Sequence, residues 1–331
     1  MFNRIPLIEL PTPLQYLSEI SRDYANEFYV KRDDLAGPEP GGNKARKLEY
    51  IMGEVKKKGC NHIITCGSVF SNHCRLTAMA ANKAGVDCTL VLNRAVESEA
   101  ETDPKLRGNY FIFQLLDVDI KLIDRSEREV TMKNIYEKLK QKGKNPYLIE
   151  AGGNEPAGVH GYVEAAAEIK EQCQLPGDKF DYIFIASGTG TTQAGLLIGN
   201  YINNCTETVI GISVEAGEKE GKQKISSSIE EYASLNGMDL SLLKEDIHFI
   251  DDYIGKGYGK IDENVASMLK YTASRENILF DPIYTGKAFT GMMAFIQKYK
   301  IKNKNILFLH TGGLPITFNK SEEIIDLLGG K

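Results

Sequence analysis

A segment rich in glycine and threonine lies between an apolar strand-like run and an apolar helical pattern. Its glycines let the backbone turn N–H groups inward, its hydroxyls add hydrogen-bond donors, and the following helix adds the positive end of its dipole. This combination predicts a cradle for a phosphate group. A plain Gly-rich turn with threonine caps has a similar composition, so the local pattern leaves both interpretations open. The segment consists of Ser187, Gly188, Thr189, Gly190, Thr191 and Thr192.

Two nucleotide-binding interpretations of this loop conflict with its sequence. A dinucleotide-binding Gly-x-Gly-x-x-Gly frame that starts at Gly188 would need a third glycine where the chain has Gln193. The loop also lacks the Gly-Lys-Ser/Thr ending of a nucleotide-hydrolysing P-loop. A nicotinamide dehydrogenase therefore remains only as a rival class, which extraction of the cofactor would distinguish.

A candidate reactive lysine, Lys44, follows two glycines and opens a helical pattern in the segment Gly-Gly-Asn-Lys-Ala-Arg-Lys-Leu-Glu. The positive end of a helix disfavours the charged form of a lysine. A lysine with a lowered pKa can attack a carbonyl group and form a Schiff base. The local pattern alone does not distinguish such a lysine from a solvated one.

Three further segments, 68–75, 280–287 and 309–315, place polar side chains next to predicted strands or helices. In the first, Ser71 precedes a helical pattern and is a typical helix cap. A serine hydrolase is not predicted, because no Gly-x-Ser-x-Gly elbow surrounds Ser71 and the nearby His73 would point away from it on a helix. The other two segments contain Tyr284 and Thr311, and each could be a structural turn.

The elements that must position these side chains alternate between short apolar runs rich in β-branched residues and amphipathic stretches. Such alternation predicts an α/β fold with right-handed crossovers and two open parallel sheets. Ligands of such sheets lie beyond the carboxyl ends of the strands. The predicted strands are 62–65, 88–92, 119–123, 147–151, 182–187, 208–214, 248–251 and 305–310, and the predicted helices are 72–84, 130–142, 158–173, 192–203, 261–273 and 286–299.

Composition limits the classes of protein that this chain can belong to. Its 331 residues, 42% of them hydrophobic, are enough for about two packed domains. A formal charge of -5 disfavours a non-specific nucleic-acid binder. The chain contains no apolar run of about 18 residues, so we expect no membrane span. The six cysteines contain no C-x-x-C pair, so we expect no metal site. Free thiols and the lack of an apolar leader predict a cytoplasmic protein.

Taken together and in this order, the five segments resemble the fold-type-II pyridoxal phosphate enzymes, whose fold is tryptophan synthase β-like. The resemblance is to the D-cysteine desulfhydrase and 1-aminocyclopropane-1-carboxylate (ACC) deaminase family, and it covers nearly the whole chain. Its most specific part is Gly-Gly-Asn-Lys-x-Arg-Lys-Leu-Glu followed about 25 residues later by Ser-Asn-His-x-Arg. The resemblance implies pyridoxal 5'-phosphate as cofactor, a small amino acid as substrate, and a homodimer.

The resemblance also implies roles for single residues. Lys44 would bind the cofactor as a Schiff base, and the loop 187–192 would hold its phosphate. Asn72 would form a hydrogen bond with the phenolic oxygen, and Ser71 and His73 would face the substrate carboxylate. Tyr284 would lie against the cofactor ring with Tyr258 nearby. The family fold implies a large domain made of residues 1–50 and 165–331, with a small α/β domain, 51–164, inserted in it.

Two positions separate the branches of the family. The deaminase branch has glutamate directly after the ring-packing tyrosine and leucine directly before the last Gly-Gly, where this chain has Thr285 and Thr311. A carboxylate beside the ring nitrogen would keep it protonated and make the ring a strong electron sink, which helps to open a cyclopropane. A good leaving group such as thiolate needs less help. Both positions therefore favour the desulfhydrase branch.

We therefore expect a β-eliminating lyase that converts D-cysteine into pyruvate, ammonia and hydrogen sulfide. Phe70 stands where the family usually has glutamine, Cys66 replaces a small residue, and both lie near the implied substrate pocket. These differences leave open a reaction on ACC, L-cysteine, D-serine or cysteate. They also leave open a non-catalytic relative that only binds a metabolite. Either Lys44 or Tyr284 is expected to remove the α-proton.

Overall fold

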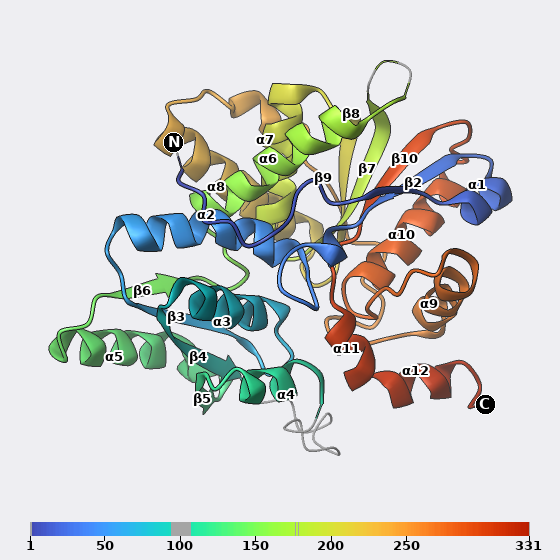
Figure 1. Ribbon diagram of the computed structural model, residues 1–331. Coiled ribbons are helices and arrows are strands. Elements are labelled where there is room, and N and C mark those ends of the chain that lie inside the picture. Colours follow the sequence, from blue (N-terminus) through green and yellow to red (C-terminus); the bar gives the residue numbers. More distant parts are fainter. Residues whose placement is uncertain (1, 94–106, 176, 178, 331) are drawn as a thin grey trace.

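Two sheets organise the described residues of the computed structural model, which are 2–93, 107–175, 177 and 179–330 (Figure 1). Neighbouring strands are parallel except for one antiparallel pair at an edge of the larger sheet. In spatial order the larger sheet consists of β1 (Leu14–Tyr16), β2 (Glu27–Lys31), β10 (Asn305–Leu309), β7 (Phe180–Ser187), β8 (Thr206–Ser213) and β9 (His248–Ile250). The smaller sheet consists of β5 (Asp119–Ile123), β4 (Asp87–Asn93), β3 (His62–Ser68) and β6 (Pro146–Ile149).

One helix, α2 (Asn43–Lys57), lies between the two sheets (Figure 1). It packs against α6 (Pro156–Gln172) on the side of the larger sheet and against α3 (Asn72–Ala84) on the side of the smaller one. The other helices are α1 (Ser18–Tyr24), α4 (Gly108–Leu115), α5 (Arg128–Gln141), α7 (Thr191–Asn203), α8 (Glu218–Asn236), α9 (Glu263–Glu276), α10 (Thr285–Lys298), α11 (Leu314–Asn319) and α12 (Ser321–Leu327). Across the described residues, no helix is both long enough and apolar enough to cross a bilayer.

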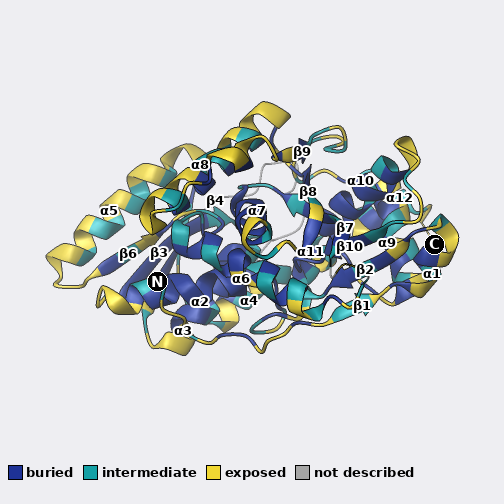
Figure 2. Ribbon diagram, turned by 90° about the horizontal axis from the view of Figure 1, so that it is seen from above, coloured by how far each residue is buried: buried dark blue, intermediate teal, exposed yellow. Residues whose placement is uncertain are grey.

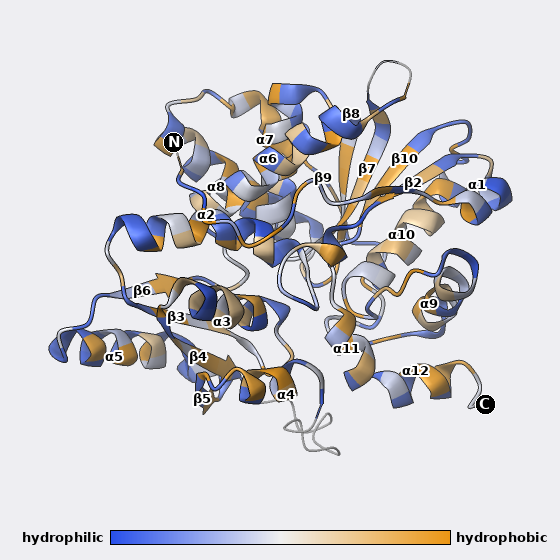
Figure 3. Ribbon diagram, viewed as in Figure 1, coloured by the Kyte–Doolittle hydropathy of each residue, from blue (hydrophilic) through white to orange (hydrophobic). Residues whose placement is uncertain are grey.

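The central strand β7 shows how the larger sheet is buried on both faces. Ile183 and Ile185 pack into a cluster with α6, α7 and α8, whereas Phe184 points to the opposite face and contacts Phe295 of α10. Side chains of a strand alternate between its two faces, so a strand covered on both sides is apolar throughout. The buried residues accordingly concentrate in the strands and on the inward sides of the helices (Figure 2), where the chain is also most hydrophobic (Figure 3).

The α/β class and the parallel sheets predicted from the sequence are confirmed, and each predicted strand and helix is present with its ends moved by a few residues. Two strands, β1 and β2, were not predicted. The strand β2 has only three apolar residues between Glu27 and Lys31, too few for a periodic signal. The long helix α8 was also missed, because it is rich in lysine and glutamate and buries only one narrow face.

The division into two domains stays a prediction. The strands of the smaller sheet all lie between residues 62 and 149, and those of the larger sheet lie before and after this stretch. Both predicted boundaries, after residues 50 and 164, fall inside helices that pack on each other, α2 and α6. Residues 94–106 of the predicted inserted domain lie outside the described residues.

A buried network of charged side chains joins α2 to β2 and α6. The guanidinium group of Arg46 donates to both carboxylate oxygens of Asp33 at 2.9 Å and to Glu168 at 2.8 and 3.0 Å. Tyr162 donates to Asp33 at 2.7 Å, and the amino group of Lys31 contacts Glu168. Two cations and two carboxylates thus compensate one another where all four side chains are buried or nearly so.

The charges of this network decide the protonation of its carboxylates. Burial by itself would raise the pKa of Asp33, but Arg46 and Lys31 outweigh burial and hold that pKa below its ordinary value. The pKa of Glu168 is lowered in the same way. Both groups are therefore charged near neutral pH, and their contribution to stability is lost as the pH falls through these lowered pKa values.

We expect Asp33→Ala to lower the free energy of unfolding by about 3–5 kcal/mol, because it leaves the buried cation of Arg46 without its main partner. Urea unfolding followed by circular dichroism measures the change. The matched control is Asp252→Ala, which breaks an exposed pair with Lys298 and should cost less than about 1 kcal/mol. Equal losses in the two variants would contradict the structural role given to the network.

Candidate active site

Three of the five segments identified in the sequence meet where strands of the larger sheet end. Gly42, at the start of α2, forms an isolated bridge with Gly312. Next to it the backbone N–H of Asn43 donates to the carbonyl oxygen of Thr311 at 3.1 Å. The carboxamide of Asn43 donates to Thr192 Oγ1 at 3.2 Å. The lysine segment thus contacts both the last Gly-Gly turn and the predicted phosphate loop.

The predicted phosphate loop connects β7 to the first turn of α7. Gly190 has a φ of +83°, a conformation that glycine adopts readily, and the helix begins at the next residue. Thr191 donates to Asn154 at 2.7 Å and contacts the hydroxyl of Thr189 at 3.2 Å. Ser187 Oγ is buried and has no hydrogen-bond partner in the described part of the protein. Buried hydroxyls normally have a partner, so this atom indicates a ligand at the loop.

Lys47 is a buried lysine near this loop that sequence analysis did not single out. Its Nζ donates to the carbonyl oxygen of Gly152 at 3.1 Å, and a Cβ at Gly152 would lie 3.0 Å from Thr189. Burial, and then the charge of Lys44, lower the pKa of Lys47 well below its ordinary value. The spacing in the sequence could have indicated Lys47, because it lies three residues after Lys44 and hence on the same helix face.

The predicted reactive lysine lies in the first turn of α2. Removal from water lowers the pKa of Lys44 to about 8. The described residues offer its amino group no hydrogen bond and no carboxylate partner, whereas the buried Arg46 two residues later has both. An amine that is partly uncharged near neutral pH can act as a nucleophile or a base. The structure therefore places an activatable amine at the meeting point of the segments.

The segment 68–75 leads into α3, and its residues have different local roles. Ser71 caps the helix, with its Oγ accepting from the N–H of Cys74 at 3.1 Å. The ring of His73 is buried, and its Nε2 lies 2.9 Å from Thr65 Oγ1. Because that hydroxyl already donates to Ile149, Nε2 carries the hydrogen and Nδ1 is the acceptor. Contacts of Ser71 and His73 with a substrate carboxylate therefore stay predictions.

Burial and the nearby charges of Lys44 and Lys47 lower the pKa of His73 well below its ordinary value, so the ring is neutral. Lys44 and Lys47 of α2 and His73 of α3 thus present positive or neutral nitrogen atoms to the space between these two helices. No compensating carboxylate for Lys44 or Lys47 occurs among the described residues. Such a region favours an anionic ligand, and a bound anion would in turn raise these pKa values.

The tyrosine segment, 280–287, follows α9 and opens α10. The hydroxyls of Tyr284 and Tyr258 lie 2.6 Å apart, which brings together two residues predicted to be neighbours. Burial, and then the neighbouring phenol, raise the pKa of Tyr284 well above its ordinary value, and burial raises that of Tyr258. Both phenols are therefore protonated near neutral pH. Lys287 supports the Tyr258 loop by donating to the carbonyl oxygen of Gly257 at 2.9 Å.

A buried carboxylate, Asp281, orders this segment, and sequence analysis did not assign it a role. It accepts hydrogen bonds from three successive backbone N–H groups, of Ile283, Tyr284 and Thr285, at 2.8 to 2.9 Å. It also accepts the single hydroxyl hydrogen of Thr285 at 2.8 Å. A Cβ at Gly313 would approach Asp281 Oδ2 to 2.5 Å, so this glycine lets the segments 280–287 and 309–315 pack together.

The arrangement changes what Thr285 can offer a ligand. Because its hydroxyl hydrogen is given to Asp281, Thr285 has only a lone pair to present to a ring nitrogen. Thr311 lies on the neighbouring turn, nearly buried, and no hydrogen bond of its hydroxyl is found among the described residues. Of the two threonines that replace the deaminase residues, Thr311 is the one with a hydrogen to donate.

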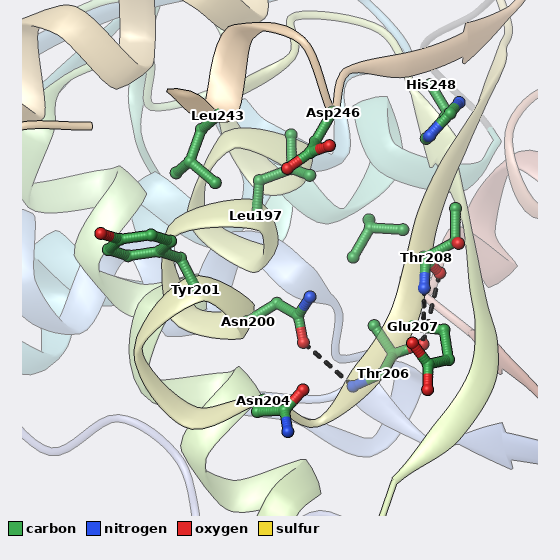
Figure 4. A pocket seen from close by; sticks show the side chains of 11 residues that line it. Leu197, Asn200, Tyr201, Asn204, Thr206, Glu207, Thr208, Leu243, Asp246 and His248 are labelled. Carbon is green, nitrogen blue, oxygen red and sulfur yellow. Dashed lines mark hydrogen bonds between the residues drawn. The ribbon is translucent and has the colours of Figure 1, made fainter. Parts of the chain in front are cut away.

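Two hollows are lined mainly by residues outside these segments, although Lys287 lines the second of them. One of about 360 Å³ lies between the end of α7 and the start of β8, lined by side chains such as Asn200, Glu207 and His248 (Figure 4). It is at the edge where β8 begins, opposite to the strand ends that carry the segments. A second hollow of about 610 Å³ lies between α9 and α10. Neither is lined by Lys44 or by the loop 187–192.

Comparison with known proteins agrees with this geometry. The model of a family described as pyridoxal-phosphate dependent enzymes matches residues 5–312. A putative 1-aminocyclopropane-1-carboxylate deaminase of Pyrococcus horikoshii is 40% identical over 330 residues, which are 99% of this chain and 97% of that protein. A D-cysteine desulfhydrase of Salmonella newport is 35% identical over 320 residues, 96% of each chain. The chain belongs to the pyridoxal-phosphate-dependent enzyme family.

A solved structure supports the same assignment. The crystal structure described as that of an ACC deaminase homologue has a TM-score of 0.89 and 38% sequence identity, and the match covers 98% of this chain and 96% of that one. The resemblance inferred from the motifs is confirmed, as is the fold-type-II architecture. The protein is an enzyme of the lyase and deaminase type, and its cofactor is pyridoxal phosphate.

The residues of this family member fit that cofactor. Ser187 Oγ is buried without a partner in the loop of positive helix-end character, and Lys47 adds a cation beside it. These groups would hold a phosphate. Lys44, with its lowered pKa, would hold the aldehyde carbon. The Tyr284 ring lies in the same group of segments. The individual assignments remain predictions, but each side chain has the chemistry that its part of the cofactor needs.

Phe70 and Cys66, the two departures noted in the sequence, lie close to α3. Phe70 is partly buried against the apolar cluster beneath α2 and α3, and its carbonyl oxygen accepts from Asn109 at 2.6 Å. Cys66 is buried against α5, and burial raises the pKa of its thiol. All six cysteines are free. Cys66 and Cys74 therefore carry protonated, weakly reactive thiols rather than nucleophiles.

We expect cofactor-free protein to bind pyridoxal phosphate at a rate that rises about ten-fold per pH unit up to about pH 8 and then levels off, because only uncharged Lys44 reacts. Stopped-flow absorbance in the visible range measures this rate. The control is free acetyl-lysine, whose rate should continue to rise toward its pKa of about 10.4. A protein rate that follows the free amine would contradict the lowered pKa.

Proposed function

We propose that the protein is a β-eliminating lyase that converts D-cysteine into pyruvate, ammonia and hydrogen sulfide. The observation that carries this proposal is the pair Thr285 and Thr311 where the deaminase branch has glutamate and leucine. Residue 285 is a threonine whose hydroxyl hydrogen is given to Asp281, so it offers a ring nitrogen no carboxylate that would keep that nitrogen protonated. A weaker electron sink suits the loss of thiolate better than the opening of a strained carbon ring.

The side chains suggest how the elimination is divided among residues. Bound pyridoxal phosphate supplies the electron sink for a negative charge at the α-carbon. The amino group of Lys44, with a pKa near 8, suits removal of the α-proton. Tyr284 keeps its proton near neutral pH and is backed by Tyr258, so we assign it the donation of a proton to the departing sulfur.

Substrate binding is assigned to the start of α3. The hydroxyl of Ser71 keeps its hydrogen while its oxygen caps the helix, and it can donate to the substrate carboxylate. The charges of Lys44 and Lys47 favour that carboxylate at longer range. Neutral His73 has only an acceptor nitrogen left, so it would have to gain a proton to help. Phe70 is assigned to the wall of the pocket that receives the β-substituent.

Other substrates of the same class remain alternatives to D-cysteine. The Pyrococcus relatives carry the name of an ACC deaminase, which favours that reaction as the second candidate. L-cysteine, D-serine and cysteate differ from D-cysteine only in handedness or leaving group. A non-catalytic metabolite-binding relative is the most distant alternative, because a lysine with a lowered pKa serves proton removal rather than binding alone. A homodimer in the cytoplasm is also part of the proposal.

The test is a panel of substrates with separate detection of products. We expect D-cysteine to yield sulfide and pyruvate in equal amounts at a higher kcat/KM than L-cysteine, D-serine, cysteate or ACC. Formation of 2-oxobutyrate from ACC as the preferred reaction would replace the proposal with a deaminase. Turnover of no amino acid by protein that carries the bound cofactor would favour a binding protein.

We expect Lys44→Ala to abolish both the visible absorption of the bound cofactor and the release of sulfide, because the proposal assigns both the cofactor bond and removal of the α-proton to this amine. Absorbance spectra of the purified and reconstituted variant measure the first effect. The matched control is Lys298→Ala, which removes an exposed amine far along α10. A visible band that persists in Lys44→Ala would show that another residue binds the cofactor.

We expect Phe70→Gln to change the preference among the panel substrates while the visible band of the bound cofactor stays as in the wild type. The reason is that Phe70 contacts apolar side chains of the smaller sheet and has no polar atom that could hold the cofactor. Ratios of kcat/KM for pairs of substrates give the measurement. Loss of the band would instead place Phe70 in direct contact with the cofactor.

A further inference from the structure

A buried arginine that has no carboxylate partner among the described residues lies next to the candidate site. Arg75 of α3 has no exposed surface, and among the described residues it contacts only neutral oxygen atoms. Its Nε donates to Asn109 Oδ1 at 2.8 Å, and one of its terminal nitrogens donates to the carbonyl oxygen of Pro40. The other terminal nitrogen is buried with no partner there. An uncompensated buried cation is costly, so a function for its position is worth seeking.

Asn109 transmits the polarity of this arginine to the cofactor-binding segment. Its carboxamide nitrogen donates to the carbonyl oxygen of Phe70 at 2.6 Å and to Asn72 Oδ1 at 2.9 Å. Asn109 itself is fully buried near the start of α4. The hydrogen bonds thus form a chain from Arg75 through Asn109 to Asn72, and every member has its direction determined by the one before.

The direction of this chain follows from donor and acceptor chemistry alone. A guanidinium group cannot accept a hydrogen bond, so the atom of Asn109 that faces Arg75 must be its oxygen. A backbone carbonyl cannot donate, so the atom that faces Phe70 must be the nitrogen. These two contacts independently give Asn109 the same orientation. Asn72 must then turn its oxygen toward Asn109, which leaves its own N–H₂ group for a ligand.

We propose that Asn109, oriented by Arg75, is a positioning residue that makes Asn72 present hydrogen-bond donors rather than an acceptor to the phenolic oxygen of the cofactor. The inference rests on the proposed function, and on the cofactor contact that the family resemblance implies for Asn72. Its new content is that a residue on a different helix, which need not touch the cofactor, decides the polarity of that contact.

The consequence for the cofactor is a matter of charge. A donated hydrogen bond stabilises the ionised phenolic oxygen, the form that absorbs in the visible range, over the neutral form that absorbs in the near ultraviolet. An amide turned the other way would face this oxygen with a lone pair. Hydrogen bonds to charged groups are strong enough for such a reversal to change the ratio of the two forms by about ten-fold or more.

The decisive variant is Asn109→Asp, which preserves shape but can only accept hydrogen bonds. Its carboxylate would still receive Arg75 but would force Asn72 to donate inward and to turn its oxygen to the cofactor. Asn109→Leu removes both contacts and leaves Asn72 free to adopt either orientation. We expect the ratio of visible to near-ultraviolet absorbance of bound cofactor at a fixed pH to fall from wild type to N109L, and further to N109D.

The melting temperatures of the two variants should not follow the order of their absorbance ratios. This difference distinguishes a positioning role of Asn109 from a purely structural one. N109D loses the hydrogen bond to the Phe70 carbonyl oxygen and sets a second acceptor against it, but it gives the buried Arg75 a counter-charge, whereas N109L leaves that cation with fewer partners. Because the ion pair is the larger effect, we expect the melting temperature of N109D to be at or above that of N109L. A structural role alone would make the spectrum follow stability. Asn82→Asp, an exposed residue of the same helix as Arg75, is the matched control for the added charge and should leave the ratio unchanged.

Several results would overturn the proposal. A wild-type spectrum in N109D, or spectra that change in the same order as the melting temperatures, would show that Asn109 does not orient Asn72. If N109D does not fold, N109L must still lower the ratio relative to wild type and N82D, and an unchanged ratio would overturn the proposal. If wild-type protein shows no visible band after reconstitution, the proposed function fails and this inference fails with it.

Discussion

The buried charge network around Arg46 is the constraint on which the rest of the site depends. Arg46 lies two residues after Lys44 on α2, and its ion pairs with Asp33 and Glu168 hold that helix against β2 and α6. The start of α2 is thereby placed against the last Gly-Gly turn and the phosphate loop. Pairing inside the network lets one charged side chain be buried at no great cost, while Lys44 next to it stays unpaired and activatable.

The separation of paired from unpaired charges gives the site its chemical character. The carboxylates near α2 are used by Arg46, Lys31 and the N-terminal segment, so none remains for Lys44 or Lys47. The buried carboxylate on the other side of the site, Asp281, is saturated by four hydrogen bonds. The region between them is therefore positive or neutral, as binding of a phosphate and a carboxylate requires.

The sequence was sufficient to predict the fold class, the central strands and the five segments, because each depends on a local pattern. Apolar periodicity indicates β7 and α3, and a Gly-rich junction indicates the loop before α7. What could not be predicted depends on contacts between distant parts of the chain. Asn109 has no motif around it and acquires a role only because α4 brings it against α3. The edge strand β1 and its neighbour β2 are defined by pairing rather than by periodicity.

The same difference explains why Thr285 and Thr311 looked equivalent in the sequence and are not so in the fold. Both are threonines at positions that separate the two branches, and both carry a hydroxyl. Asp281 takes the hydrogen of Thr285, whereas the hydroxyl of Thr311 remains on the turn that packs against it. The electronic argument for elimination of thiolate thus depends on Asp281 and Thr311 together. In the proposed reaction Asp281 would keep Thr285 from donating to the ring nitrogen, and Thr311 would be left to provide a neutral donor.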